Sequence, residues 1–175
     1  MSAIETALRS VMDRAVETCL EHVGNGGLPF VGVIVDQGGK VISEFGVNRV
    51  AETGDPTAHA EVVAMRDAMT TYGLDTLTGM VLLATGEPCG LCYRHALDHG
   101  IASIYVAVDR DEVAHLGFDY RASYRAFGIT DADRAELFRH LPVARGIDPF
   151  THFLHLHLSG HAIAWPGTES KGTPS

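Results

Sequence analysis

Four residues in two short segments carry side chains that can bind a metal ion and move protons. His59 and Glu61 stand in the first segment, and Cys89 and Cys92 stand in the second. Cysteines three positions apart on a helical turn lie roughly 60° from each other, so both thiolates can bind one ion. With His59 as the third ligand, a fourth position stays open for water, which is the arrangement of a catalytic zinc site. Glu61 is then the carboxylate beside that water.

The order of these residues matches a zinc enzyme signature, His-x-Glu followed by Pro-Cys-x-x-Cys. Here it stands as His59-Ala60-Glu61 and Pro88-Cys89-Gly90-Leu91-Cys92. On these motifs the chain resembles the cytidine/deoxycytidylate deaminase superfamily, and the run Asp55-Pro56-Thr57-Ala58-His59-Ala60-Glu61-Val62 resembles its guanine deaminase branch. The resemblance implies a Zn²⁺-dependent hydrolase acting on the C–N bonds of cyclic amidines, with guanine to xanthine plus ammonia as the preferred reaction.

Each of the four residues receives a role from this pattern. His59, Cys89 and Cys92 are predicted to hold the zinc ion, and Glu61 is predicted to carry protons from water to a ring nitrogen and then to the leaving amine. Taken singly, they could be a capping histidine, two buried thiols and a solvated carboxylate or hydrogen-bond partner of His59. Their joint occurrence favours the metal site.

One condition must hold for His59 and Glu61 to share a site. In an ideal helix, residues two positions apart point about 200° away from each other. We therefore expect a helix to begin around them, where side chains still converge from the first turn. Asp55-Pro56, a capping residue followed by proline, predicts that start.

The resemblance also implies residues that contact the substrate. Asn48 corresponds to an asparagine that contacts the ring in relatives, and its amide can both donate and accept; alternatively it only makes a turn. Phe30 lies in a segment similar to a Pro-Phe-Gly-Ala stretch whose aromatic ring flanks the base, although Val31 replaces the glycine. A plain core role for Phe30 stays open. Ala60 is predicted to contact substrate from within the motif.

Substrate specificity is predicted to depend on Asp119. The segment Gly117-Phe118-Asp119-Tyr120 resembles the Gly-Phe-Asp-Asp stretch of guanine deaminases, in which an acid can accept hydrogen bonds from guanine. Tyr120 replaces the second acid, and Gly90-Leu91 stands where Pro-Met is common. These departures keep another ring open as the substrate: a nucleoside, an aminated triazine, a pyrimidine or a pterin-like metabolite.

The composition of the chain limits which kinds of substrate and cellular location are expected. The formal net charge is −9, whereas nucleic-acid-binding proteins usually carry a basic face, so we expect a small-molecule substrate and no nucleic acid, with tRNA adenosine deamination as a weaker alternative. A non-catalytic zinc-binding scaffold is a further alternative. Apolar runs are too short to cross a membrane, and three cysteines make no disulfide framework, so a cytoplasmic location is predicted.

The pattern of elements predicts an α/β protein with a three-layer α/β/α cytidine deaminase-like fold and a mixed sheet of about five strands. Residues 1–165 are expected to form one zinc-dependent deaminase domain, with a C-terminal arm at about 141–165 and a disordered tail at 166–175. A homodimer is expected, since the arm loosely resembles a segment that related guanine deaminases swap between subunits. The expected helices cover 2–22, 55–73, 89–99 and 131–140, and the expected loops cover 46–53 and 110–130. Strands are expected at 30–35, 40–45, 80–85 and 101–108, and the alternating residues 153–158 are expected to form a fifth strand or an extended arm.

Histidines are frequent near the C-terminus, at His152, His155, His157 and His161. On the expected strand, His155 and His157 would share one face and could chelate a metal ion. An exposed or interface face of the strand is the simpler interpretation.

Overall fold

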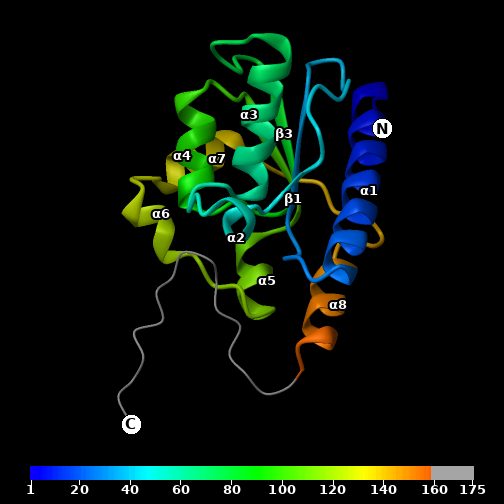
Figure 1. Ribbon diagram of the computed structural model, residues 1–175. Helices are drawn as coiled ribbons and strands as arrows, with labels where there is room; N and C mark the ends of the chain where they lie inside the picture. The colour runs from blue at the N-terminus through cyan, green and yellow to red at the C-terminus, as the bar shows by residue number, and fades with distance from the viewer. Residues whose placement is uncertain (159–175) are drawn as a thin grey trace.

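The computed structural model describes residues 1–158, which form a five-stranded sheet between two layers of helices (Figure 1). Helices α1 and α8 pack together on one side, and α3 and α4 lie on the other side. The predicted three-layer α/β/α architecture with a mixed sheet is therefore confirmed. The strands are β1 (Val31–Val35), β2 (Gly46–Val47), β3 (Val81–Gly86), β4 (Ser103–Val108) and β5 (Phe138–His140). The helices are α1 (Ala3–Gly24), α2 (Val50–Thr53), α3 (Ala60–Tyr72), α4 (Gly90–Asp98), α5 (Arg110–His115), α6 (Ala122–Ala126), α7 (Asp131–Leu137) and α8 (Asp148–Leu156).

The strands follow the order β2-β1-β3-β4-β5. Strand β1 runs antiparallel to both its neighbours, whereas β3, β4 and β5 are parallel. Helix α4 connects β3 to β4, which is the crossover that the sequence predicted. All five residues of β1 are buried because helices cover both faces of the sheet there.

The region after β1 differs from the prediction. Instead of a strand over 40–45, only Val41 forms a bridge, to Val35, and the next strand begins at Gly46. Side chains take over backbone hydrogen bonds here: the Ser43 hydroxyl accepts from the Ile34 amide at 2.8 Å, and the Asp67 carboxylate accepts from the Glu44 amide at 2.6 Å. The expected loop at 46–53 consequently contains β2 and the short helix α2.

The segment after β4 is more ordered than predicted. Residues 110–130 contain α5 and α6, and the Asp109 carboxylate caps α5 by accepting from the amides of Asp111 and Glu112. Thr130, not Asp131, caps α7. That helix ends at Leu137, and residues 138–140 then pair with β4 as the fifth strand. Parallel pairing to a distant strand has no local sequence signal, which explains this error.

The predicted strand at 153–158 is wrong, because the segment belongs to α8 and the turn after it. Pro149 stands in the first turn, and Phe150 and Phe153, three positions apart, share the buried face of a helix. The alternating His and Leu residues obscured this helical period. The proposed tail, the end of the arm and His161 lie outside the described residues. Within residues 1–158, no helix is long and apolar enough to cross a membrane.

Candidate zinc centre and active site

Three side chains meet with the geometry of a tetrahedral metal site. The His59 Nδ1 atom lies 3.4 Å from the Cys89 Sγ atom and 3.5 Å from the Cys92 Sγ atom, and the two sulfurs are 3.7 Å apart. With Zn–S and Zn–N bonds of about 2.3 and 2.0 Å, a tetrahedron has S–S edges of about 3.8 Å and N–S edges of about 3.5 Å. The three atoms therefore fit zinc without rearrangement. Among residues 1–158, no other group of three such side chains comes this close.

The start of α3 explains how His59 and Glu61 reach one site. His59 is the N-cap, with extended backbone angles of φ −68° and ψ 156°, and Glu61 is the second helical residue. Because His59 lies before the first helical residue, the 200° separation does not apply. The prediction that the helix starts at Asp55 is wrong: the Asp55 carboxylate accepts from the Thr57 amide in the preceding turn and pairs with Arg66 at 2.8 Å.

Glycine at position 32 lets the start of α3 lie directly on β1. A Cβ atom added to Gly32 would lie 2.8 Å from the Glu61 Cα atom and 3.2 Å from the Glu61 nitrogen. No larger residue fits without moving the helix. The position of Glu61 is therefore set by backbone packing between a helix and a strand.

The two thiols stand at the N-terminus of α4, where Cys89 is the N-cap and Cys92 lies in the first turn. Backbone amides and the helix dipole favour negative charge there. Hydrogen bonds from Cys92 and His59 hold the pKa of the Cys89 thiol well below its usual range, whereas burial raises that of the neighbouring Cys92 thiol. The Cys89 side chain is therefore suited to bind a metal ion as a thiolate.

Glu61 is buried within this cluster, with 4% of its surface exposed. Its Oε2 atom lies 3.4 Å from the Cys92 Sγ atom. Burial, followed by the Cys89 charge, raises the pKa of Glu61 to about 7. A carboxyl group with such a pKa can both accept and release a proton near neutrality, as a proton carrier must.

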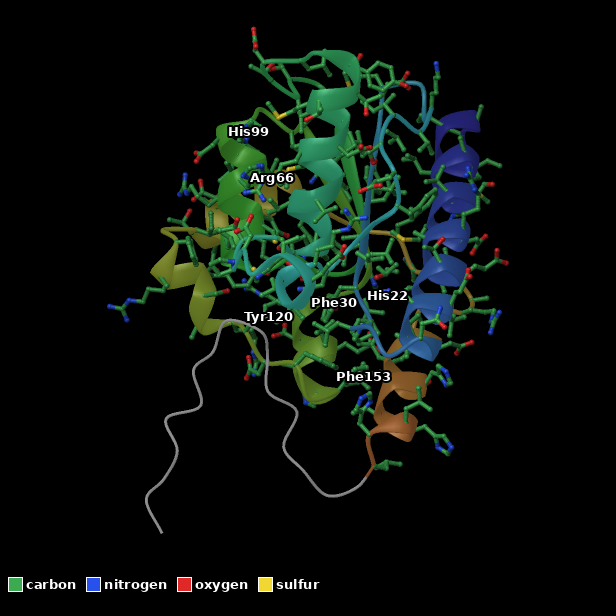
Figure 2. The ribbon with its side chains drawn as sticks, in the orientation of Figure 1. His22, Phe30, Arg66, His99, Tyr120 and Phe153 are labelled. Carbon is green, nitrogen blue, oxygen red and sulfur yellow. The ribbon has the colours of Figure 1, made fainter. Side chains whose placement is uncertain are left out.

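The candidate substrate residues differ in their surroundings. Phe30 and Tyr120 lie near the end of the sheet where α3 begins (Figure 2). Phe30 is buried against Phe118 and Phe150, with both ring centroids at 5.4 Å, so the core role considered for it is realised in this structure. Its contact with substrate stays a prediction.

Ala60 directly follows the predicted ligand His59, and Asn48 lies in a loop that is hydrogen-bonded to the segment before His59. The Asn48 side-chain oxygen accepts a hydrogen bond from the Val50 amide at 3.1 Å. The Arg49 amide donates to the carbonyl oxygen of Ala58, the residue before His59. The turn role of Asn48 is therefore present, and its loop is tied to the loop that carries His59. Ala60 is buried as the first residue of α3. Ring contacts by either residue stay predictions.

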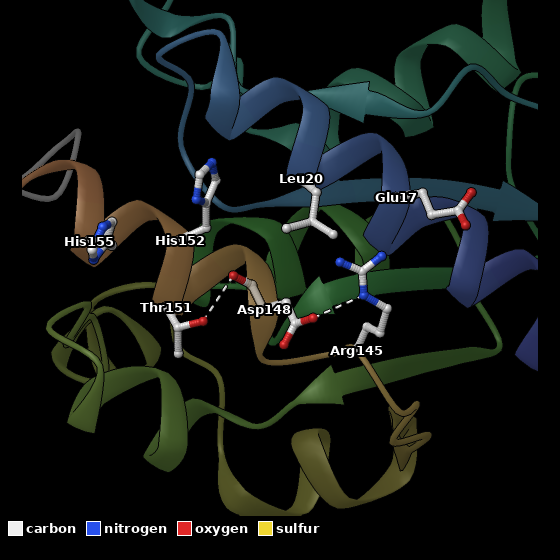
Figure 3. A pocket seen from close by; sticks show the side chains of 7 residues that line it. All are labelled: Glu17, Leu20, Arg145, Asp148, Thr151, His152 and His155. Carbon is white, nitrogen blue, oxygen red and sulfur yellow. Dashed lines mark hydrogen bonds and ion pairs between the residues drawn. The ribbon is translucent and has the colours of Figure 1, made fainter.

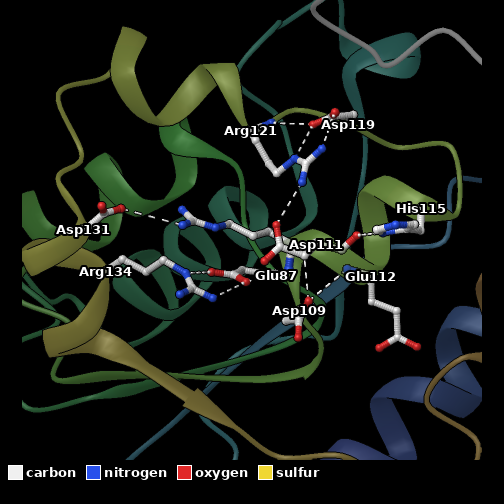
Figure 4. Close-up of polar contacts among 10 residues, drawn as sticks. Glu87, Asp109, Asp111, Glu112, His115, Asp119, Arg121, Asp131 and Arg134 are labelled. Carbon is white, nitrogen blue, oxygen red and sulfur yellow. Dashed lines mark hydrogen bonds and ion pairs between the residues drawn. The ribbon is translucent and has the colours of Figure 1, made fainter.

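Asp119 is exposed and engaged by a neighbour. Its carboxylate accepts from the Arg121 guanidinium twice, at 2.9 Å, and Arg121 also pairs with Asp111 at 3.0 Å (Figure 4). Hydrogen bonds from Arg121 lower the pKa of Asp119 to about 2. The following residue, Tyr120, points inward and is buried. Asp119 would have to leave Arg121 to contact a ring, so its specificity role stays a prediction without support from this geometry.

Two of the histidines near the C-terminus line a groove away from the predicted zinc site. A groove of about 800 Å³ lies between α1 and α8, and both His152 and His155 face it (Figure 3). His155 and His157 do not share a strand face, since His155 lies in the last turn of α8 and His157 is the C-cap of that helix. In the described part of the chain they are not members of any three-residue metal cluster.

Sequence reasoning missed the residues that form hydrogen bonds and an ion pair with the segment leading to Cys89. Glu87 is fully buried and pairs with Arg134, while the hydroxyl groups of Tyr120 and Tyr124 donate to the carbonyls of Glu87 and Pro88. The four-residue spacing of the tyrosines was visible, but their partners lie more than thirty positions away. No local pattern could identify these contacts.

The sequence is similar to those of known zinc-binding deaminases. Residues 5–108 match the model of the cytidine and deoxycytidylate deaminase zinc-binding region. The chain belongs to this family of zinc-binding deaminases. It is 33% identical to a guanine deaminase of Bacillus subtilis over 140 residues, covering 79% of this chain and 88% of that protein.

Two solved structures extend the comparison. A Bacillus subtilis guanine deaminase structure has a TM-score of 0.60 at 29% identity, covering 87% of this chain and 96% of its own. A Nitrosomonas europaea guanine deaminase has a TM-score of 0.70 at 19% identity, covering 86% and 84%, which supports the fold alone. The resemblance to the deaminase superfamily and its guanine deaminase branch is thus confirmed.

Proposed function

We propose that this protein is a zinc-dependent aminohydrolase that converts guanine and water to xanthine and ammonia. The observation that carries the proposal is the triad of His59, Cys89 and Cys92 at tetrahedral spacing with the buried Glu61 beside it. Zinc held by these three residues supplies Lewis acidity that makes hydroxide available near neutral pH. The remaining chemistry belongs to the chain itself.

Glu61 is the proposed proton carrier. Its carboxylate takes a proton from the attacking water and delivers it to the ring nitrogen beside the reacting carbon. A second proton then passes from the added hydroxyl group through Glu61 to the amino group; the C–N bond breaks, ammonia leaves, and a carbonyl remains on the ring. The burial of Glu61 supports this role, because an environment that excludes bulk water raises the pKa of a carboxyl group toward the working pH.

Guanine as the substrate is supported by the guanine deaminase relative, which aligns with most of this chain. The net charge of −9 supports a free base over tRNA, since phosphate contacts require cationic surfaces. Asn48, Phe30, Ala60 and Asp119 remain the proposed contacts to the ring. Residues 1–165 are proposed to act as one deaminase domain.

Ammonia release from a panel of bases, nucleosides, aminated triazines and pterins tests the proposal. Guanine should give the highest kcat/KM, and Glu61→Gln should lower kcat by about 10²- to 10⁴-fold with zinc content unchanged. Turnover of another amine without turnover of guanine would contradict the substrate. Wild-type turnover by Glu61→Gln would contradict the mechanism.

Deamination of a different small ring is the second candidate. The observation that favours it is the inward position of Tyr120 together with the pairing of Asp119 to Arg121, which leaves neither residue as an acceptor for guanine in this geometry. A pyrimidine or triazine lacks the fused imidazole ring and needs fewer polar contacts. The same panel separates the two candidates.

We further propose a cytoplasmic homodimer that functions in purine metabolism. None of the three cysteines forms a disulfide, and a reducing compartment keeps cysteines in that state. Within the described residues, α8 packs against α1 of its own chain, so exchange of the C-terminal segment is a separate question from dimerisation. Light scattering gives the oligomeric state, and a cross-link between cysteines introduced into α1 and α8 distinguishes intrachain from interchain packing.

A further inference from the structure

Glu87 is a buried acid that the proposed chemistry does not use. It stands two residues before Cys89, and none of its surface is exposed. A charge in such a position is costly unless donors surround it. Because water cannot reach the Glu87 carboxylate, groups of the protein must stabilise it.

Four donors surround the Glu87 carboxylate. The Arg134 guanidinium donates through Nε at 2.5 Å and through Nη2 at 3.0 Å, forming a two-point ion pair (Figure 4). The Tyr93 hydroxyl donates at 2.9 Å and the Arg110 amide at 2.7 Å. These donors come from α7, α4 and the start of α5, so one carboxylate links three helices.

The backbone beside Glu87 is held as firmly as its side chain. The Tyr120 hydroxyl donates to the Glu87 carbonyl, and the Tyr124 hydroxyl donates to the Pro88 carbonyl. On the other side of Cys89, the Gly90 amide donates to the Ser123 hydroxyl at 2.8 Å. Every residue that flanks Cys89 in the segment 87–90 thus has a side-chain partner outside the segment.

Gly90 makes the last of these contacts possible. A Cβ atom at this position would lie 2.2 Å from the Ser123 carbonyl oxygen, so α6 can approach the loop only because residue 90 lacks a side chain. A proline here would also lack the amide that donates to Ser123. The departure from Pro to Gly in this chain is therefore matched by a partner on α6.

We propose that Arg134 and Ser123 are positioning residues for the zinc site, acting through Glu87 and Gly90 on the segment that carries Cys89. This inference rests on the proposed zinc ligands. Groups that fix the orientation of metal ligands commonly change metal affinity by about 10- to 100-fold when removed. Neither Arg134 nor Ser123 is one of the predicted zinc ligands, so each can change the zinc affinity only by moving the segment 87–90.

Zinc affinity of the full-length protein, measured by competition with a chromophoric chelator, tests the proposal. Arg134→Met should weaken zinc binding by about 10- to 100-fold, and Ser123→Ala should weaken it by about 10-fold. Arg134→Lys, which retains the charge but makes one contact in place of two, should restore part of the loss. The absorption spectrum of the Co²⁺-substituted protein should shift in Arg134→Met, because it reports the ligand geometry.

Arg94→Met is the matched control. The Arg94 guanidinium also donates to carbonyls next to α6, those of Phe127 and Gly128 at 3.1 and 3.0 Å, but it does not contact the segment 87–90. This variant loses the same charge and a similar number of bonds. It should leave the zinc affinity and the Co²⁺ spectrum as in the wild type.

Thermal unfolding with and without zinc distinguishes positioning from stability alone. If Arg134→Met and Ser123→Ala lower the Tm but retain wild-type zinc affinity and Co²⁺ spectrum, the proposal is overturned. Should Arg134→Met not fold, Ser123→Ala decides alone by the same criteria. Because no readout depends on turnover, a failure here is distinct from a wrong substrate: the latter would leave zinc binding intact and change only the ammonia assays.

Discussion

Replacing Gly32 by alanine tests whether backbone packing sets the position of Glu61. The added Cβ atom would lie 2.8 Å from the Glu61 Cα atom, with the Ala60 carbonyl oxygen at 3.3 Å. Carbon atoms in favourable contact are about 3.5–4.0 Å apart, so strand and helix must separate by roughly 0.7–1.2 Å. Both contacts are backbone atoms, which cannot rotate away as a side chain could.

The magnitude follows from this displacement. A misplacement of about 1 Å of a reacting group can lower the rate by about 100-fold. Overpacking of this kind destabilises a protein by about 1–3 kcal/mol. We therefore expect Gly32→Ala to remain folded while kcat falls by about 10- to 100-fold.

Steady-state ammonia release, zinc content and chemical denaturation measure these effects. Gly38→Ala is the control, because its Cβ atom would meet only the Asp36 side chain, at 3.3 Å, in an exposed turn. This control should keep wild-type kcat. If Gly32→Ala is zinc-loaded and turns over at the wild-type rate, the reasoning that β1 positions Glu61 is refuted.

Three further predictions concern stability. Gly90→Ala should lower the free energy of unfolding by about 1–3 kcal/mol despite a helix propensity gain of about 1 kcal/mol, because its Cβ would meet the Ser123 carbonyl; a more stable variant in urea denaturation would contradict this. Burial and the neighbouring His99 lower the pKa of His95 to about 4, so the folded state prefers the neutral ring. The contribution of the neutral His95 ring to the free energy of unfolding is complete above about pH 6.5 and is lost as the pH falls toward 4. His95→Gln should reduce this acid-induced loss by about 1 kcal/mol, a value that allows for the partial exposure of the ring. An unchanged dependence of the free energy of unfolding on pH would refute the assignment. Zinc removal should lower the Tm, corresponding to about 4 kcal/mol when free zinc was about 1,000 times its Kd, and equal Tm values for zinc-loaded and zinc-free protein would contradict a folded-state site.

Local sequence signals were sufficient for much of the fold. The helical period of α1, the apolar runs of β3 and β4 and the glycine after α3 each act within a few residues, and the structure contains the corresponding elements. Predictions failed where distant partners compete with local preference. Ser43 bonds to Ile34 in place of a regular ladder, and residues 138–140 become a strand only because β4 offers a parallel edge.

The amino-acid sequence by itself determined the reaction class. His59, Cys89, Cys92 and Glu61 are identified by type and order alone, because few combinations of imidazole, thiolate and carboxylate can hold zinc beside a proton carrier. Only the tertiary structure decided how these groups meet. It placed His59 outside the helix, set Glu61 on Gly32, and surrounded Glu87 with donors from three helices. Gly32 and Glu61 lie 29 positions apart and Glu87 and Arg134 lie 47 apart, so no local spacing encodes these contacts.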